Sequence, residues 1–428
     1  MGILIKGGTV TDPAAGLNGK TDVRIKDGLI VQVGEDLKPE GDDAVLDASG
    51  LCVLPGLVDM HVHLRDPGLT DKEDLCSGSR AAARGGVTTL LAMPNTRPVI
   101  DTPDRAAYVL NKAQEVSPVH ILQAGSLTRG EEGRELSDIA GMARAGVKAL
   151  SEDGKSVMDA GLCRQAFAQA AACGLLVCDH CEDLSIRGNG CMNEDENARR
   201  LGLDGIPASV EDTITARDMI LAAETGARLH LCHVSTEGVT RLLRFARENG
   251  WEQVSAEVCP HHLLLSSDDI PGDDPDYKMN PPLRTPRDVQ ALREALAAGL
   301  IDVISTDHAP HTQRDKEGSM RTAAFGIVGL ETSLPLIYTY LVRTGILTLS
   351  QMVEKMSLNP ARLLGLPCGT LLPGHPADVI LVDLETPYRI DRSSFVSKGR
   401  NTPFDGWEVR GKVMVTIVDG KIVYKDKE

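Results

Sequence analysis

The sequence predicts an α/β protein with a central TIM-type (β/α)8 barrel and one small β-sandwich formed by both chain termini. Between residues 55 and 365, a β run followed by a helical pattern occurs eight times. Both ends of the chain instead carry short alternating runs separated by turn residues. The first strand is not followed by G-x-G-x-x-G, and no P-loop occurs, which counts against a doubly wound open sheet. We therefore assign residues 1–54 and 366–428 to the sandwich and 55–365 to the barrel.

The N-terminal segment begins with β runs such as ILIKGG and TDVRIKDGLIVQVG. Its Asp27-Gly28 pair lies between two alternating runs and predicts a hairpin. The last sixty residues have the same character, with a second such pair at Asp419-Gly420. Neither end is long enough for a core of its own. We therefore expect the two ends to pair, which requires the ends of the barrel to lie near each other.

The strands expected in the barrel are continuous apolar stretches, typical of parallel sheets that are buried on both faces. In chain order they are residues 57–63, 86–93, 119–125, 147–152, 175–180, 228–234, 253–259 and 302–307. The intervening helices carry boundary signals. Thr102 and Thr285 each precede a proline at the first helical position, and Gly174 and Gly226 follow the last helical residue. The apolar stretch 327–340 predicts a further barrel helix.

Composition excludes several classes of protein. The 428 residues include 61 acidic and 45 basic side chains, and the net charge of −16 argues against a nucleic acid or an anionic membrane as partner. No apolar run approaches the ~20 residues that a bilayer requires, and no signal segment opens the chain. Ten scattered cysteines do not form a disulfide framework. We expect a cytoplasmic protein.

Catalytic residues of barrels gather at the C-terminal ends of the strands. Six of the eleven histidines fall at or just after these ends: His61, His63, His180, His233, His308 and His311. Side chains alternate along a strand, so His61, His63 and Arg65 project to one side. Carboxylates follow strands four and eight, at Asp153 and Asp307. Four imidazoles and two carboxylates suit two zinc ions, with manganese, cobalt or nickel as substitutes, and with one carboxylate bridging.

Five longer motifs accompany these ligands: HVHLRDPG, AMPNTRPV, MNPPLR, STDHAPH and FGIVGLET. Together with the paired histidines they resemble the amidohydrolase superfamily and, within it, the dihydroorotases of the long bacterial class. The resemblance covers essentially the whole chain. It implies a zinc-dependent, reversible ring opening that interconverts (S)-dihydroorotate and N-carbamoyl-L-aspartate in de novo pyrimidine biosynthesis.

The resemblance also implies a ligand set for two zinc ions: His61, His63 and Asp307 for one, His180 and His233 for the other, and Asp153 as the bridge. The bridge has alternatives in the adjacent Glu152 and in a carboxylated Lys148 or Lys155. Glu152 is expected to face the opposite way, and Lys148 to lie too deep in its strand. Asp307 is expected to act as general acid and base towards a hydroxide that bridges the metals.

The substrate contacts implied by the resemblance are His63, Arg65, Asn95, Asn280, His311, Phe325 and Gly326. Arg65 offers a planar fork that matches a carboxylate, and we expect Arg65 and His311 to supply positive charge. Asn280 and the backbone at Phe325-Gly326 are expected to address the ring amides, although Ala324 stands where relatives often have proline. The polar segment 312–324 is either a solvated loop or a lid.

Other functions compete with this interpretation. Hydantoinase, dihydropyrimidinase and allantoinase share the fold and the paired histidines, but they generally rely on a carboxylated lysine and lack an arginine for a ring carboxylate. A non-catalytic relative that scaffolds aspartate transcarbamoylase has lost metal ligands. His261-His262 could mimic ligands, but the metal set is already complete, so we expect other roles for this pair. The resemblance further predicts a homodimer and an association with aspartate transcarbamoylase.

Overall fold

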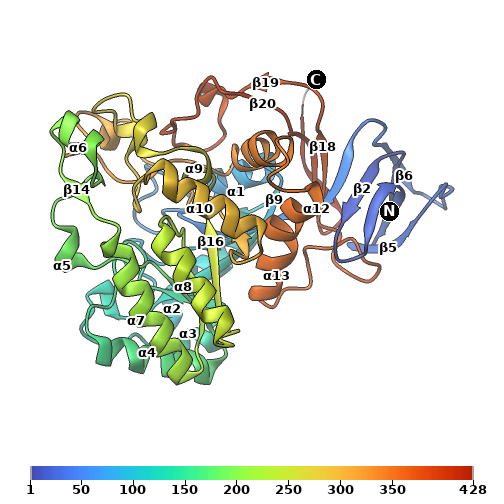
Figure 1. The fold of residues 1–428 in the computed structure, drawn as a ribbon. Coiled ribbons are helices and arrows are strands. Elements are labelled where there is room, and N and C mark those ends of the chain that lie inside the picture. Colours follow the sequence, from blue (N-terminus) through green and yellow to red (C-terminus); the bar gives the residue numbers. More distant parts are fainter. Residues whose placement is uncertain (1, 427–428) are drawn as a thin grey trace.

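The computed structural model describes residues 2–426, and its centre is a sheet of eight parallel strands (Figure 1). In spatial order these strands are β8 (Leu57–Val62), β9 (Val87–Ala92), β10 (His120–Ser126), β11 (Ala149–Ser151), β12 (Leu176–Asp179), β15 (Arg228–Leu231), β16 (Val254–Val258) and β17 (Val303–Ile304). A parallel bridge between Val62 and His308 links the last strand to the first. The predicted barrel and all eight of its strands are confirmed.

Helices follow the strands, and the seven longer ones contact one another in chain order. The longer ones are α1 (Leu75–Arg84), α2 (Pro103–Val116), α3 (Ile139–Arg144), α4 (Ala160–Cys173), α7 (Ser209–Thr225), α8 (Glu237–Glu248) and α10 (Pro286–Ala297). The boundary signals act as predicted. Thr102 and Thr285 cap α2 and α10 through their side chains, while Gly174 and Gly226 end α4 and α7 in the left-handed conformation that glycine adopts without strain.

The remaining elements outside the sandwich sheets are shorter. They are α5 (Leu184–Arg187), α6 (Glu196–Leu201), α9 (Pro260–Leu264), α11 (Ser333–Ile337), α12 (Leu349–Val353) and α13 (Asn359–Leu363), with the strand pairs β13 (Met192–Asn193) and β14 (Gly205–Ile206), and β19 (Tyr388–Arg389) and β20 (Glu408–Val409). The helix predicted over 327–340 is shorter than expected. Its first residue, Ile327, pairs with His308 instead, and α11 begins only at Ser333 before a π-helical turn over Tyr338–Val342.

Both ends of the chain meet in a pair of sheets beside the barrel (Figure 1). One sheet holds β1 (Gly2–Lys6), β4 (Asp22–Lys26), β5 (Leu29–Gly34) and β6 (Ala44–Asp47). The other mixes β2 (Thr9–Asp12), β3 (Leu17–Lys20) and β7 (Cys52–Pro55) with the C-terminal β18 (Val379–Asp383), β21 (Lys412–Val418) and β22 (Lys421–Lys425). β7 pairs directly with β18, so that Val53 lies opposite Leu381.

A shared core joins the two sheets. Ile5 and Val23 of the first sheet belong to one buried apolar cluster with Val53, Leu381 and Ile417 of the second. Both chain termini therefore bury their apolar faces against each other, as expected for a sandwich. The exact boundaries at residues 54 and 366 stay predictions. Among residues 2–426, no helix has the length and apolar character needed to cross a bilayer.

Candidate metal centre and substrate cavity

The strand ends bring the predicted ligands together. His61 lies within β8, and the other five follow the strands β8, β11, β12, β15 and β17 by one to three residues: His63, Asp153, His180, His233 and Asp307. All six side chains are buried. The backbones of His233 and Asp307 have φ of 36° and 48°, a left-handed conformation that costs non-glycine residues energy and is concentrated at functional sites.

Asp153 lies at the centre of the group. Its carboxylate is 3.1 Å from Nε2 of His61 and 3.5 Å from Nε2 of His63. It is 4.0 Å from the nearer ring nitrogens of His180 and His233. Asp307 closes the other side, with Oδ1 3.0 Å from Nε2 of His63 and 3.7 Å from Nε2 of His61. Four imidazoles therefore direct nitrogens at two carboxylates.

The alternatives for the bridging position lie elsewhere. The Glu152 carboxylate turns away and accepts hydrogen bonds from the backbone N–H and the hydroxyl of Thr128. Lys148 is exposed, and Nζ of Lys155 donates to the backbone carbonyl of Glu131 at 2.8 Å. The geometry therefore favours Asp153 over Glu152 and over both lysines.

The outward nitrogens of three histidines have their own partners. Nδ1 of His61 donates to Glu257 at 3.0 Å, and Nε2 of His180 donates to Glu182 at 3.3 Å. Nδ1 of His63 donates to the side-chain oxygen of Asn95 at 3.0 Å. Such partners fix the tautomer and the ring orientation of metal-binding histidines.

Glu257 and Glu182 were missed by the sequence analysis. Glu257 is fully buried in β16, where its carboxylate also accepts from Nε2 of His230 at 3.1 Å and from the Ser305 hydroxyl at 2.6 Å. A glutamate inside the apolar run QVSAEVC was the available signal, because a buried carboxylate requires partners. The partners themselves come from other strands and could not be read from that run.

Burial and neighbouring charges give the members of this group different protonation states. Burial opposes the charge on Asp307, but a hydrogen bond from His63 and the nearby His61 lower its pKa to about 2. Burial also opposes the charge on His61, but the nearby Asp153 carboxylate and the hydrogen bond to Glu257 raise its pKa well above the ordinary value. Burial and repulsion from His180 and His61 lower the pKa of His233 to about 3. Burial likewise opposes the charge on Asp153, but the His61 and His63 imidazoles hold its pKa well below the ordinary value. Both carboxylates are thus ionised near neutral pH, while His233 is neutral.

The donor atoms fit divalent cations. Nε2 of His61 is buried and has no hydrogen-bond partner among residues 2–426. Nδ1 of His180 and Nε2 of His233 approach to 3.0 Å, and His61, His63 and Asp307 each place a ligand atom within 4.8 Å of the others, as do His61, Asp153 and His233. Buried imidazoles and carboxylates in this arrangement are typical ligands of zinc and related metals. These residues could therefore hold a metal centre.

A cavity of about 190 Å³ opens above this centre. It is lined by eleven of the twelve predicted site residues, namely His63, Arg65, Asn95, Asp153, His180, His233, Asn280, Asp307, His311, Phe325 and Gly326. His61 is fully buried and does not line it. The cavity also contains Arg187, which the sequence analysis missed. Its guanidinium lies 5.0 Å from the centre of the Phe325 ring and pairs with Glu182 at 2.7 Å.

Three predicted substrate contacts have protein partners in this structure. Nδ2 of Asn95 donates to Asp153 at 2.7 Å, and Nδ2 of Asn280 donates to Glu182 at 3.0 Å. His311 donates from Nε2 to the carbonyl of Phe325 at 2.8 Å. The prediction that His311 supplies positive charge is wrong. Burial and the neighbouring cations Arg65, Lys72 and Lys316 lower its pKa to about 2, so the imidazole is neutral.

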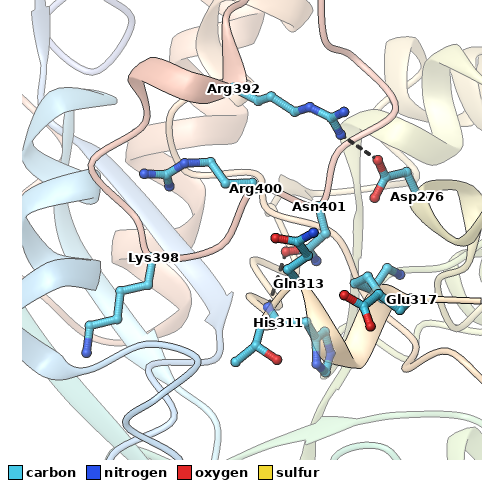
Figure 2. Close-up of a pocket in the computed structure, with 10 residues that line it drawn as sticks. Asp276, His311, Gln313, Glu317, Arg392, Lys398, Arg400 and Asn401 are labelled. Atoms are coloured by element: carbon cyan, nitrogen blue, oxygen red, sulfur yellow. Dashed lines mark hydrogen bonds and ion pairs between the residues drawn. The ribbon is translucent and has the colours of Figure 1, made fainter.

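A second, outer cavity of about 580 Å³ adjoins the first at His311 (Figure 2). It separates residues 311–317 from the C-terminal segment 392–401, and Arg392 spans its edge by pairing with Asp276 at 2.7 Å. Nζ of Lys316 donates to the carbonyls of Lys278, Ala324 and Gly326. These bonds hold segment 312–324 against the Phe325-Gly326 wall of the catalytic cavity.

Comparisons with known proteins identify the families that this chain matches. Residues 50–238 match the family described as Dihydro-orotase-like, and residues 253–424 match the family described as Amidohydrolase family. The dihydroorotase of Pelotomaculum thermopropionicum is 48% identical over 431 residues, covering 100% of this chain and 99% of the relative. That of Geobacter metallireducens is 46% identical over 425 residues, covering 99% and 100%.

Solved structures show the same architecture. The L-hydantoinase (dihydropyrimidinase) of Arthrobacter aurescens superposes with a TM-score of 0.90 at 30% identity, covering 100% of this chain and 96% of that one. The dihydropyrimidinase of Brevibacillus agri gives a TM-score of 0.88 at 25% identity over the same shares. Hydantoinases thus share the fold, whereas the dihydroorotases match the sequence at higher identity over its full length. On this evidence the chain belongs to the dihydroorotase family of the amidohydrolases.

Proposed function

We propose that this protein is a dihydroorotase that interconverts (S)-dihydroorotate and N-carbamoyl-L-aspartate. The observation that carries the proposal is the convergence of four imidazoles, Asp153 and Asp307 beneath a cavity that also contains Arg65. Imidazole and carboxylate ligands suit a pair of zinc ions, with Asp153 between them. Arg65 supplies the positive charge that the carboxylate of the substrate requires.

Different residues of the chain have different roles in the reaction. Bound divalent ions would polarise the amide carbonyl and lower the pKa of a water molecule. Asp307 is ionised at neutral pH and lies on the floor of the cavity, so its carboxylate can accept a proton and later deliver it to the departing ring nitrogen. Glu257 holds His61, and Asn95 holds His63, in the orientations that direct Nε2 inward.

Hydantoinase or dihydropyrimidinase activity is the second candidate, because the solved neighbours carry these names. Two features of this chain favour dihydroorotate. Asp153 occupies the central position, while Lys148 and Lys155 lie away from it. Arg65 lines the cavity and offers a bidentate partner for a ring carboxylate, which hydantoin lacks.

Other expectations from the resemblance stay predictions. They are the presence of two zinc ions per subunit, a homodimer, and an association with aspartate transcarbamoylase. Segment 312–324 is docked against the cavity wall through Lys316, and its action as a lid also stays a prediction. Unchanged proteolysis of this segment with and without dihydroorotate would contradict the lid.

One experiment tests the function. The purified protein is analysed for metals and assayed in parallel with dihydroorotate, hydantoin and allantoin. We expect kcat/KM to be highest for dihydroorotate and to fall on chelation, with recovery after zinc is returned. Faster turnover of hydantoin or allantoin would replace the proposal with the corresponding cyclic amidohydrolase, and full activity without metal would contradict the ligand assignment.

A further inference from the structure

A second group of metal-type ligands follows β16. Cys259 precedes helix α9, and His261 and His262 lie in its first turn. Their exposed fractions are 0%, 2% and 2%, so all three side chains are enclosed by protein. The sequence analysis identified the histidine pair but expected roles other than metal binding for it, because other residues completed the catalytic set.

The three side chains converge. Cys259, His261 and His262 each place one ligand atom within 4.8 Å of the other two. The centres of the two imidazole rings are 4.3 Å apart. Such spacing allows one cation to contact a sulfur and two nitrogens after small side-chain rotations, since the expected bond lengths are about 2.3 Å for Zn–S and about 2.0–2.1 Å for Zn–N.

The imidazoles have nitrogens without partners. His262 donates from Nε2 to the carbonyl of Pro281 at 3.0 Å, so in the neutral ring Nδ1 carries the lone pair. Within the part of the chain that the structure describes, neither Nδ1 of His262 nor Nε2 of His261 has a hydrogen-bond partner. Buried polar atoms are rarely left unpaired in native proteins, so such atoms indicate an occupant.

The charges around the group suit a cation. Burial keeps both imidazoles neutral, which is the metal-binding form, and lowers the pKa of His262 to about 4. Burial raises the pKa of the Cys259 thiol, and the carboxylates of Asp307 and Glu257 raise it further. The same carboxylates would stabilise a dication at this position.

We propose that Cys259, His261 and His262 form a further metal site, distinct from the centre around Asp153 and Asp307, for a zinc-class divalent ion. Cys259 binds as a thiolate, so that loading releases its proton to solvent. A water molecule enclosed with the ion would complete a four-coordinate shell. Because His262 also holds the carbonyl of Pro281, the ion would fix the segment that carries Asn280 at the wall of the catalytic cavity.

A trapped water molecule is the competing occupant, because it could donate hydrogen bonds to both Nε2 of His261 and Nδ1 of His262. The thiol favours the metal, since sulfur is a weak hydrogen-bond acceptor but a strong zinc ligand. The six residues assigned to the catalytic centre supply only nitrogen and oxygen. A metal–sulfur bond is therefore a signature that those six residues cannot produce.

The test uses the intact protein loaded with zinc or with cobalt. X-ray absorption of the zinc form should show a Zn–S distance near ~2.3 Å, and the cobalt form should show a thiolate-to-cobalt charge-transfer band. Cys259→Ser should abolish both signals and lower the metal content by one ion per chain. His261→Gln should also lower the metal content by one ion.

Cys368→Ser is the matched control, because Cys368 is buried but belongs to none of the clusters of possible ligands found among residues 2–426. It should leave both signals intact. Absence of metal–sulfur signals from the wild-type protein would overturn the proposal and leave the water, whether or not the variants fold. Signals that survive Cys259→Ser but disappear in Cys232→Ser would also overturn it, because Cys232 forms another group with His61 and Glu257.

Discussion

Replacing Glu257 by glutamine tests whether the metal centre depends on a residue that does not line the cavity. In the wild-type protein, Oε1 of Glu257 accepts from Nδ1 of His61 at 3.0 Å, and Oε2 accepts from Nε2 of His230 at 3.1 Å. Glutamine has the same shape but only one acceptor oxygen. One of the two imidazoles must therefore lose its partner, and His61 loses the negative charge that makes Nε2 a better ligand.

The size of the effect follows from these bonds. A hydrogen bond to a charged group contributes about 1.5–3 kcal/mol, which corresponds to a loss of roughly one to two powers of ten in an equilibrium constant. Losing the partner of a metal-binding histidine typically costs ~10–100-fold in metal affinity or activity. We therefore expect Glu257→Gln to weaken zinc binding by ~10–100-fold. The assay is competition against a chelator of known affinity, with kcat/KM measured at saturating zinc.

Glu211→Gln is the matched control. Glu211 is equally buried, and its carboxylate accepts from the backbone and hydroxyl of Ser235 and pairs with Arg284, outside the metal centre. It should lower the stability of the fold while leaving zinc affinity unchanged. The reasoning is refuted if Glu257→Gln binds zinc as tightly as the wild-type protein, or if both variants lose affinity to the same extent.

Further predictions concern the remaining site residues. His61→Ala should abolish turnover and binding of the ion that this imidazole holds; full activity would overturn the metal assignment. Asp153→Asn should lower metal content and kcat/KM by more than the ~10–100-fold typical of a ligand's hydrogen-bond partner, whereas Glu152→Gln should retain the metal. Arg65→Gln should raise KM for dihydroorotate by ~10²-fold with unchanged metal content, and an unchanged KM would remove Arg65 from the carboxylate site. Burial and the charges of Glu152 and Asp153 raise the pKa of Glu131 to about 9, so ionising it destabilises the fold increasingly as pH rises from about 4.5 to 9. Glu131→Gln should raise the melting temperature near pH 8 but not near pH 4, and equal shifts at both would contradict this origin.

Much of the barrel was predictable because its signals are local. Each strand is an apolar run that stops at polar residues, and strand ends in a barrel meet on one face, so the six histidines could be assigned to one region. The helix expected over 327–340 begins only at Ser333, for a non-local reason. Ile327 pairs with His308, and this contact between distant segments takes precedence over helical spacing in the sequence.

The same distinction applies to the site. Ligand positions could be predicted because each lies at or just after the end of a strand, and eleven of the twelve predicted residues line one cavity. The orientation and the charge of the side chains could not be predicted from the sequence. The supporting role of Glu257 depends on His61 and His230 from two other strands, and the neutral state of His311 depends on cations such as Arg65 and Lys72, which lie more than two hundred residues earlier in the chain. Such partners become visible only in three dimensions.

The pairing of β7 with β18 has a consequence for biosynthesis. Val53 leaves the ribosome early, yet its partner Leu381 is made more than three hundred residues later. At ~5–20 residues per second the delay is roughly 15–65 s, during which the apolar faces of the first strands lack their permanent cover. The nascent chain must therefore complete its barrel before β7 can pair with β18 and the N-terminal strands can reach their final packing. Aggregation during translation should depend on how fast the last fifty residues are synthesised.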